Sequence, residues 1–93
     1  MNRLEDKVAI ITGATGGIGK AATELFLNEG ANVLMVDLNE DDLIEVTKEI
    51  DSNKLSYFQG DVSQYSDNLK AVELAVERYG GLDIFIANAG VAG

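Results

Sequence analysis

The feature that most constrains this chain is a glycine-rich stretch, residues 12–19, set between a short apolar run and an amphipathic segment. The run, residues 8–11, is rich in β-branched side chains, which indicates a strand buried on both faces. The segment after it, residues 17–29, has apolar side chains at helical spacing. Strand, glycine turn and helix in this order favour a phosphate site, because helix-start amides are unpaired and absent side chains let a pyrophosphate approach the backbone. An ordinary tight turn, which also accepts glycine, is the alternative.

The same alternation of apolar runs and amphipathic segments continues along the chain. Strands are predicted at residues 7–12, 32–36, 55–59 and 82–86. Helices are predicted at residues 17–29, after a cap at Asn39, and from a cap at Ser63 or Ser66 to Gly80. Strands separated by helices of about 10–15 residues pair in parallel through right-handed crossovers. We therefore predict one α/β domain over residues 1–93, a Rossmann-like parallel sheet (β-α-β-α-β-α-β) with strand order 3-2-1-4, which is an incomplete doubly wound fold.

Each predicted helix carries an apolar stripe that we expect to face the sheet. The stripes are Ile18, Ala21, Ala22, Leu25 and Phe26 in the first helix, Leu43, Val46, Thr47 and Ile50 in the second, and Leu69, Val72, Val76 and Tyr79 in the third. Gly30 is predicted to close the first helix. The first two helices are expected on one face of the sheet and the third on the other, which leaves apolar surface for a further segment or another copy of the chain to cover.

Composition excludes several classes of function. The formal net charge of −9 argues against nucleic acid and anionic membrane surfaces, since either needs clustered Lys and Arg. The sequence has no Cys and no His, so disulfides and the usual zinc sites are excluded and no metal site is predicted. No apolar stretch approaches the roughly 18–20 residues of a membrane span. Residues 1–7 lack the apolar core of a signal peptide, so we expect a cytoplasmic protein.

Asp37 ends the second apolar run and lies 18 positions after Gly19, close to the spacing of about 20 between a glycine turn and the acid that binds an adenosine ribose. A carboxylate at this place accepts both ribose hydroxyls and repels the 2′-phosphate of NADP. NAD is therefore the predicted cofactor, in preference to NADP. The alternative is a strand-end Asp that makes a turn.

The spacing of Gly13, Gly17 and Gly19 is G-x-x-x-G-x-G, with Thr12 before it and Ile18 inside it. With these residues the chain resembles the short-chain dehydrogenase/reductase family. Two later motifs extend the resemblance over the whole chain: Asp61-Val62 after the third run, and Asn88-Ala89-Gly90 after the fourth. Ala87 is a departure, because the family often has a further Asn there.

The resemblance implies a role for each matching residue. Gly13, Thr15, Gly17, Ile18 and Gly19 line the pyrophosphate and the adjoining ribose, Asp37 holds the adenosine ribose, Asp61 and Val62 contact the adenine, and Asn88, Ala89 and Gly90 pass beside the cofactor toward the nicotinamide. The residues themselves leave other interpretations open: Asp61 as a turn residue or helix cap, and Asn88 as a partner of loop backbone. Lys20 and the acidic run 40–42 are interpreted as solvent-facing.

Members of this family use a Ser, a Tyr and a Lys four positions after that Tyr. Tyr57, Tyr65 and Tyr79 are followed at that distance by Asp61, Leu69 and Asp83, so no catalytic residue is assigned. The first hypothesis is the NAD-binding half of an oxidoreductase that transfers a hydride when its C-terminal half is present. The second is a non-catalytic module of a truncated relative that holds the dinucleotide or associates with a partner. A methyltransferase is a third class, whose fold also places an acid after the second strand.

Overall fold

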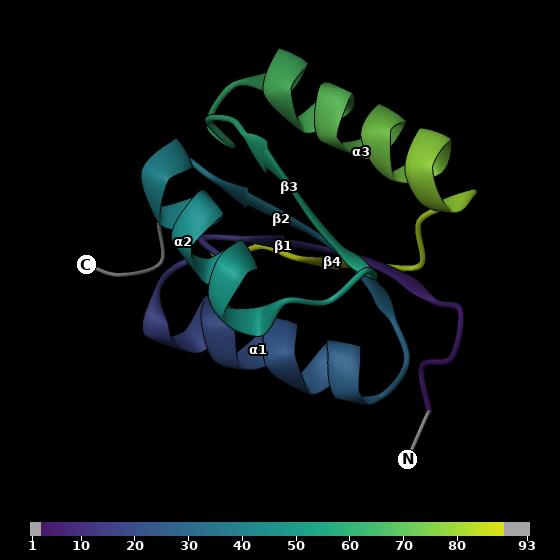
Figure 1. Cartoon of the computed structure of the whole chain (residues 1–93). Coiled ribbons are helices and arrows are strands. Elements are labelled where there is room, and N and C mark those ends of the chain that lie inside the picture. Colours follow the sequence, from purple (N-terminus) through teal and green to yellow (C-terminus); the bar gives the residue numbers. More distant parts are fainter. Residues whose placement is uncertain (1–2, 89–93) are drawn as a thin grey trace.

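The computed structural model describes residues 3–88. Its elements are β1 (Val8–Thr12), α1 (Gly17–Asn28), β2 (Asn32–Asp37), α2 (Glu40–Ile50), β3 (Leu55–Gln59), α3 (Tyr65–Tyr79) and β4 (Ile84–Ile86). The strands form one parallel sheet in the order β3-β2-β1-β4 (Figure 1). The α/β fold, the alternation of elements and the strand order predicted from the sequence are all confirmed.

Strand β1 lies inside the sheet and is buried along its whole length. It pairs with β2 from Val8 opposite Asn32, and with β4 from Ala9 opposite Ile84. Helices α1 and α2 cover one face of the sheet and α3 covers the other (Figure 1). Because all strands run in parallel, their carboxyl ends meet at one edge, where ligands bind in folds of this kind.

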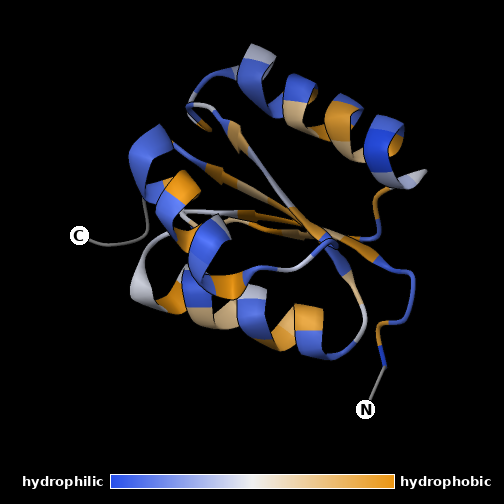
Figure 2. Ribbon diagram, in the orientation of Figure 1, coloured by the Kyte–Doolittle hydropathy of each residue, from blue (hydrophilic) through white to orange (hydrophobic). Residues whose placement is uncertain are grey.

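Alternate residues of the strands supply two apolar clusters, one on each face of the sheet. The cluster under α1 and α2 contains Ala9, Ile11, Val33, Met35, Leu43 and Val46 among its buried members. The cluster under α3 contains Val8, Ile10, Leu34, Val36, Ala71 and Ala75. Figure 2 shows the same division, with apolar residues along the strands and on the helix surfaces turned toward them, and polar residues outward. Burial of one Leu or Ile side chain stabilises the fold by about 1.5–3 kcal/mol, so the two clusters hold the layers together.

The predicted stripe of α1 is wrong in part. Ile18 and Leu25 are 76% and 56% exposed, whereas Gly19 and Thr23 are buried. The cause is the close approach of the helix to the glycine turn, since a Cβ on Gly19 would lie 2.1 Å from the carbonyl oxygen of Gly13. The smallest residue therefore faces inward, Ala22 and Phe26 of the predicted stripe pack against the core, and Ile18 and Leu25 face solvent.

Helix α3 differs from its prediction for the same reason. Ala71 and Ala75 are buried against the sheet, while Leu69 and Val76 are 48% and 49% exposed. Small side chains let the helix lie close to the strands, so the larger residues are displaced to its flanks. The stripe of α2 is confirmed, with Leu43 and Val46 buried.

Most predicted helix ends are confirmed. Gly30 and Gly80 adopt left-handed backbone angles, φ +95° and +89°, where α1 and α3 end. The Asn39 side chain accepts a hydrogen bond from the Asp42 amide at the start of α2 (3.1 Å). The cap predicted for α3 is wrong, because Gln64 is the cap, and the hydroxyl of Ser63 donates instead to Asp61. Strand β4 is also shorter than predicted, beginning at Ile84.

Candidate functional site

A groove of about 640 Å³ lies at the carboxyl ends of the strands, bordered by residues of the glycine turn and of the loops that follow β2, β3 and β4. It is lined by Gly13, Thr15, Gly16, Val36, Asp37, Leu38, Gly60, Asp61, Val62, Ser63 and Asn88. The sequence predicted Gly13, Thr15, Asp37, Asp61, Val62 and Asn88 as site residues. The sequence analysis missed five residues of this lining, which are Gly16, Val36, Leu38, Gly60 and Ser63. The sequence could have indicated them only because each is adjacent to a predicted site residue. Ala89 and Gly90 lie outside the described residues.

The glycine turn leaves donors free at the start of α1. Gly13 has a left-handed φ of +61°, and its carbonyl accepts a hydrogen bond from the Gly16 amide (3.3 Å). Within residues 3–88, the amides of Gly17, Ile18 and Gly19 donate no hydrogen bond to the protein. A Cβ on Gly17 would meet no atom outside its own helix within 4 Å, so the surface of the helix is open at Gly17. The first turn of α1 can therefore accept an anion, and the exposed Ile18 side chain stands next to it.

Asp37 is held against this turn by two donors of one residue. Its Oδ2 accepts hydrogen bonds from the Thr15 hydroxyl (2.7 Å) and the Thr15 amide (3.2 Å). Its Oδ1 accepts from the Leu38 amide (2.8 Å). An ionised carboxylate has about four lone-pair positions, so one position on Oδ1 is open. The carboxylate can thus accept a hydroxyl donor from a ligand in the groove.

The loop after β3 contains a second carboxylate, on Asp61. Its Oδ1 accepts hydrogen bonds from the hydroxyl and the amide of Ser63, at 2.7 and 2.9 Å. These two bonds, the hydroxyl first, hold the pKa of Asp61 below its ordinary value of 3.8. The group is therefore an anion at neutral pH, with its other oxygen available as an acceptor.

Thr12 connects the end of β1 to the end of β4. Its hydroxyl donates to the Ile86 carbonyl (3.2 Å) and accepts from the Asn88 amide (2.9 Å). The Asn88 side chain in turn donates to the Gly13 carbonyl (3.3 Å). Asn88 is therefore a partner of loop backbone, as the alternative interpretation has it, and also a residue of the groove wall.

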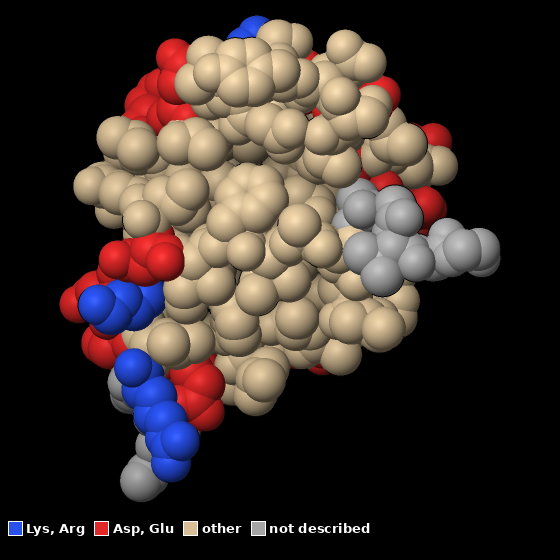
Figure 3. All heavy atoms as spheres, turned by 180° about the vertical axis from the view of Figure 1, so that it is seen from behind, with Lys and Arg blue, Asp and Glu red and all other residues tan. Residues whose placement is uncertain are grey.

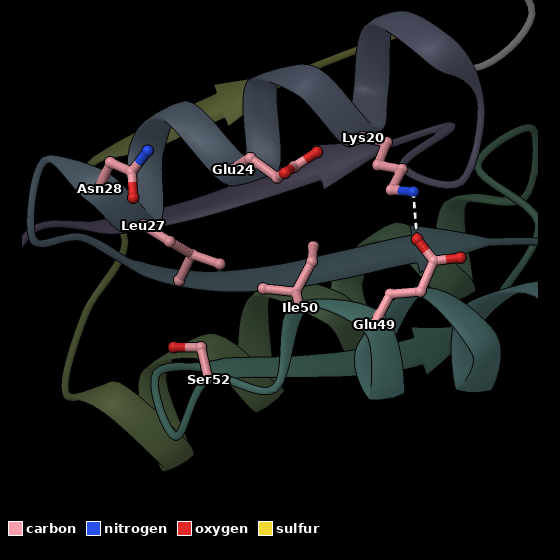
Figure 4. Close-up of a pocket in the computed structure, with 7 residues that line it drawn as sticks. All are labelled: Lys20, Glu24, Leu27, Asn28, Glu49, Ile50 and Ser52. Atoms are coloured by element: carbon pink, nitrogen blue, oxygen red, sulfur yellow. Dashed lines mark hydrogen bonds and ion pairs between the residues drawn. The ribbon is translucent and has the colours of Figure 1, made fainter.

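A second groove, of about 370 Å³, lies between α1 and α2 and contains none of the predicted site residues (Figure 4). Figure 4 shows Lys20 of α1 directed toward Glu49 of α2, with which it forms an ion pair. The Glu49 carboxylate raises the pKa of Lys20, so this ammonium is charged but neutralised by its partner. The Lys20 side chain is 33% exposed, which agrees with the solvent-facing interpretation from the sequence, and it also bridges two helices.

Among residues 3–88 no three Asp or Glu side chains are grouped closely enough to hold a metal ion. None of the helices there has the length and apolarity that crossing a lipid bilayer requires.

The parallel sheet, the glycine turn and the groove at the strand ends place the molecule in the class of doubly wound α/β folds. Within that class, the chain belongs to the short-chain dehydrogenase family, because the model of that family, described as short chain dehydrogenase, matches residues 7–93. The family predicted from the glycine spacing and the three other motifs is therefore confirmed.

Relatives of known sequence support the assignment. The chain is 42% identical over 89 residues to short-chain dehydrogenase reductase 3a of Arabidopsis thaliana, covering 96% of this chain and 35% of that protein. It is 40% identical over 91 residues to the 3-oxoacyl-[acyl-carrier-protein] reductase of Thermotoga maritima, covering 96% and 37%. The chain spans about a third of the length of these curated relatives.

Solved structures of the family resemble this one closely. A short-chain dehydrogenase/reductase of Brucella melitensis, described as a glucose/ribitol dehydrogenase, superposes with a TM-score of 0.85 at 37% identity over 88% of this chain and 35% of that one. A 3-ketoacyl-(acyl-carrier-protein) reductase of the same organism, solved with NADH, gives a TM-score of 0.82 at 36% identity, covering 88% and 33%.

Proposed function

We propose that this chain is the NAD-binding part of a short-chain dehydrogenase/reductase, an oxidoreductase that transfers a hydride between NAD and an alcohol or carbonyl substrate. Residues 1–93 are proposed to form one dinucleotide-binding domain. The observation that carries the proposal is that Asp37 lines one groove together with Gly16, the residue that directly precedes the free amides of α1. Gly17, Ile18 and Gly19 themselves are not part of that lining. A solved relative that binds NADH supports it.

The start of α1 fits a pyrophosphate. Its amides lack protein acceptors within residues 3–88, and the space beside Gly17 holds no protein atom within 4 Å of a Cβ position. The helix dipole adds about 0.3–1 kcal/mol of attraction for an anion at this end. We assign Gly13, Gly17, Ile18 and Gly19 to the pyrophosphate and the ribose beside it, and Thr15 to the same turn.

Asp37 fits the adenosine ribose and favours NAD over NADP. A hydroxyl of the sugar can donate to the open position on Oδ1, while the Thr15 hydroxyl and amide hold Oδ2. A 2′-phosphate would bring like charge to the same place. At a separation of about 4 Å, each pair of unit charges costs roughly 1 kcal/mol in water and roughly 4 kcal/mol near a protein surface. That cost exceeds what one new hydrogen bond to the phosphate returns.

The remaining site residues are assigned by their positions along the groove. Asp61 and the Val62 amide are proposed to contact the adenine, from the loop after β3. Asn88, with Ala89 and Gly90 after it, is proposed to pass beside the cofactor toward the nicotinamide. When bound, the nicotinamide ring supplies the hydride chemistry, and the residues of this chain bind and orient it.

None of the described residues that line the groove is a Tyr or a Lys. The hydroxyl of Tyr79 lies against Ser56 (2.6 Å) and the Val33 carbonyl (3.3 Å), inside the fold rather than in the groove. No Tyr in the sequence is followed four positions later by Lys. A second candidate function is a dinucleotide-binding or oligomerisation module without turnover, and the activity test below distinguishes it from the oxidoreductase.

The surface supports a partner for this domain. Phe85 of the edge strand β4 is 42% exposed and pairs in register with Ile10, a member of the cluster under α3. Leu69 and Val76 of α3 are also about half exposed. Seen from behind, the molecule presents a broad face that is almost free of charged side chains (Figure 3). We propose that a C-terminal half or a second copy covers this apolar surface.

Calorimetric titration with NAD, NADP and S-adenosylmethionine tests the proposal. We expect NAD to bind most tightly and S-adenosylmethionine not to bind. Tightest binding of S-adenosylmethionine would favour a methyltransferase, and tighter binding of NADP than of NAD would contradict the role of Asp37. NADH formation with a panel of alcohols, by the full-length protein, separates the oxidoreductase from the non-catalytic module.

A further inference from the structure

Two side chains in the first turn of α3 hold the loop that follows β3. Oδ2 of Asp67 accepts a hydrogen bond from the Asp61 amide, six residues earlier in the chain, at 2.8 Å. Nδ2 of Asn68 donates to the Val62 carbonyl, also at 2.8 Å. Neither residue lines the groove, whereas Asp61 and Val62 both do. Asp67 and Asn68 therefore fasten the loop from its far side.

Other polar groups of the loop are also hydrogen-bonded within the protein. The Asp61 carbonyl accepts from the Gln64 amide (2.9 Å), and Oδ1 of Asp61 accepts from Ser63. Over residues 3–88, the Val62 amide donates to no protein atom and Oδ2 of Asp61 accepts from none. The loop thus offers the groove one hydrogen-bond donor beside one acceptor.

The Val62 amide donor and the Asp61 carboxylate acceptor complement adenine but not hypoxanthine. Adenine carries a ring acceptor, N1, beside an amino donor, N6, so it complements the Val62 amide and the Asp61 carboxylate. Hypoxanthine carries a ring N–H beside a carbonyl oxygen, which reverses both positions. A buried donor and acceptor left without partners cost more than the bonds themselves contribute. The loop therefore discriminates between the two bases only while its own geometry is fixed.

We propose that Asp67 and Asn68 are positioning residues that fix this donor–acceptor pair, and that they set a preference for an adenine dinucleotide over its hypoxanthine analogue. The inference rests on the proposed function, because it takes the adenine to lie at this loop. An acid in the first turn also stabilises a helix through its dipole. That purely structural role changes the affinity for both dinucleotides equally, whereas positioning changes their ratio.

The test titrates the full-length protein with NAD and with nicotinamide hypoxanthine dinucleotide. The wild type is expected to prefer NAD about tenfold. Asp67→Ala is expected to lower the NAD affinity several-fold and to bring the two affinities within about twofold of each other. Asp67→Asn retains an acceptor oxygen and is expected to restore most of the preference. Asn68→Ala is expected to have the same effect on the two affinities as Asp67→Ala, so it tests the inference if Asp67→Ala does not fold.

Glu73→Ala is the matched control, since it removes an exposed acid from the same helix without touching the loop. It is expected to leave the preference unchanged. Equal binding of both dinucleotides by the wild type would overturn this inference and leave the proposed function standing. The same conclusion would follow if folded Asp67→Ala and Asn68→Ala kept the wild-type ratio of the two affinities. A wild type that binds neither dinucleotide overturns both.

Discussion

The hydroxyl of Thr15 lies 2.7 Å from Oδ2 of Asp37, although the two residues are 22 positions apart in the sequence. The Thr15 amide donates to the same oxygen at 3.2 Å. The turn that precedes α1 therefore fixes the acid that ends β2. Because Asp37 cannot swing away without breaking these bonds, its negative charge stays at the place where a 2′-phosphate would lie.

Replacement of Thr15 tests this relationship. Thr15→Val keeps the shape of the side chain but removes the donor, so the carboxylate gains freedom to turn from the groove. We expect the preference for NAD over NADP to narrow about 3- to 10-fold, which corresponds to the net value of roughly one hydrogen bond. Thr15→Ser keeps the hydroxyl and should retain the preference. Equal NAD-to-NADP ratios in Thr15→Val and the wild type would show that the contact does not control selectivity.

The two glycines at the start of α1 are expected to behave differently. A Cβ on Gly19 would lie 2.1 Å from the Gly13 carbonyl oxygen, so Gly19→Ala should lower the free energy of unfolding by about 1–3 kcal/mol. A Cβ on Gly17 meets no protein atom within 4 Å, so Gly17→Ala should leave that free energy within about 1 kcal/mol of the wild type. If the space beside Gly17 belongs to the pyrophosphate, Gly17→Ala still loses NAD affinity.

Urea unfolding together with NAD titration measures both effects. Normal NAD binding by Gly17→Ala would place the pyrophosphate elsewhere. Gly19→Ala is the comparison variant, because it is expected to lose NAD binding together with stability, whereas Gly17→Ala is expected to lose NAD binding alone.

The pH dependence follows from Asp61. Because its hydrogen bonds with Ser63 lower its pKa in the folded state, the stability that they contribute is present above the ordinary value of 3.8. That contribution is lost as the pH falls through the lower folded-state pKa. We expect the side-chain carboxyl resonance of Asp61 to titrate below 3.8 by NMR, and Ser63→Ala to raise its pKa toward that value. A titration of Asp61 that Ser63→Ala does not move would contradict the assignment of this cause.

The exposed apolar surface predicts self-association of the 93-residue chain when it is produced alone. Phe85→Lys places a charge on the edge strand β4 and is expected to shift the sedimentation profile toward monomer. Gln59→Lys adds the same charge to β3, at the opposite edge of the sheet, and should not change the profile. A wild-type chain that sediments as a stable, monodisperse monomer would contradict this prediction.

The sequence predicts the arrangement of elements well, because glycines, caps and periodic apolar runs act locally. Gly30 and Gly80 end helices through their own backbone angles, and Asn39 caps α2 through a residue three positions away. Motif spacing also predicts which residues reach the groove, since Asp37 and Asp61 both follow strands whose ends meet at one edge.

Contacts between distant segments are not visible in such patterns. The helical spacing of apolar side chains placed Leu25 and Leu69 on the sheet-facing stripes, but Gly19 and Ala75 are among the buried residues in those helices. The tie between Asp67 and the Asp61 amide was missed because an acid in a first turn is ordinary in a helix. The cap of α3 was predicted at Ser63 or Ser66. The spacing of residues could not show that the Ser63 hydroxyl donates to Asp61 instead, because that bond depends on the turn between the two residues.

A crystal structure of the full-length protein with NAD tests the binding mode at every point of the groove. We expect the pyrophosphate to lie within hydrogen-bond distance of the Gly17–Gly19 amides and the adenosine ribose to donate to the Asp37 carboxylate. Density for the dinucleotide in the groove between α1 and α2, or a ribose turned away from Asp37, would contradict the proposed site.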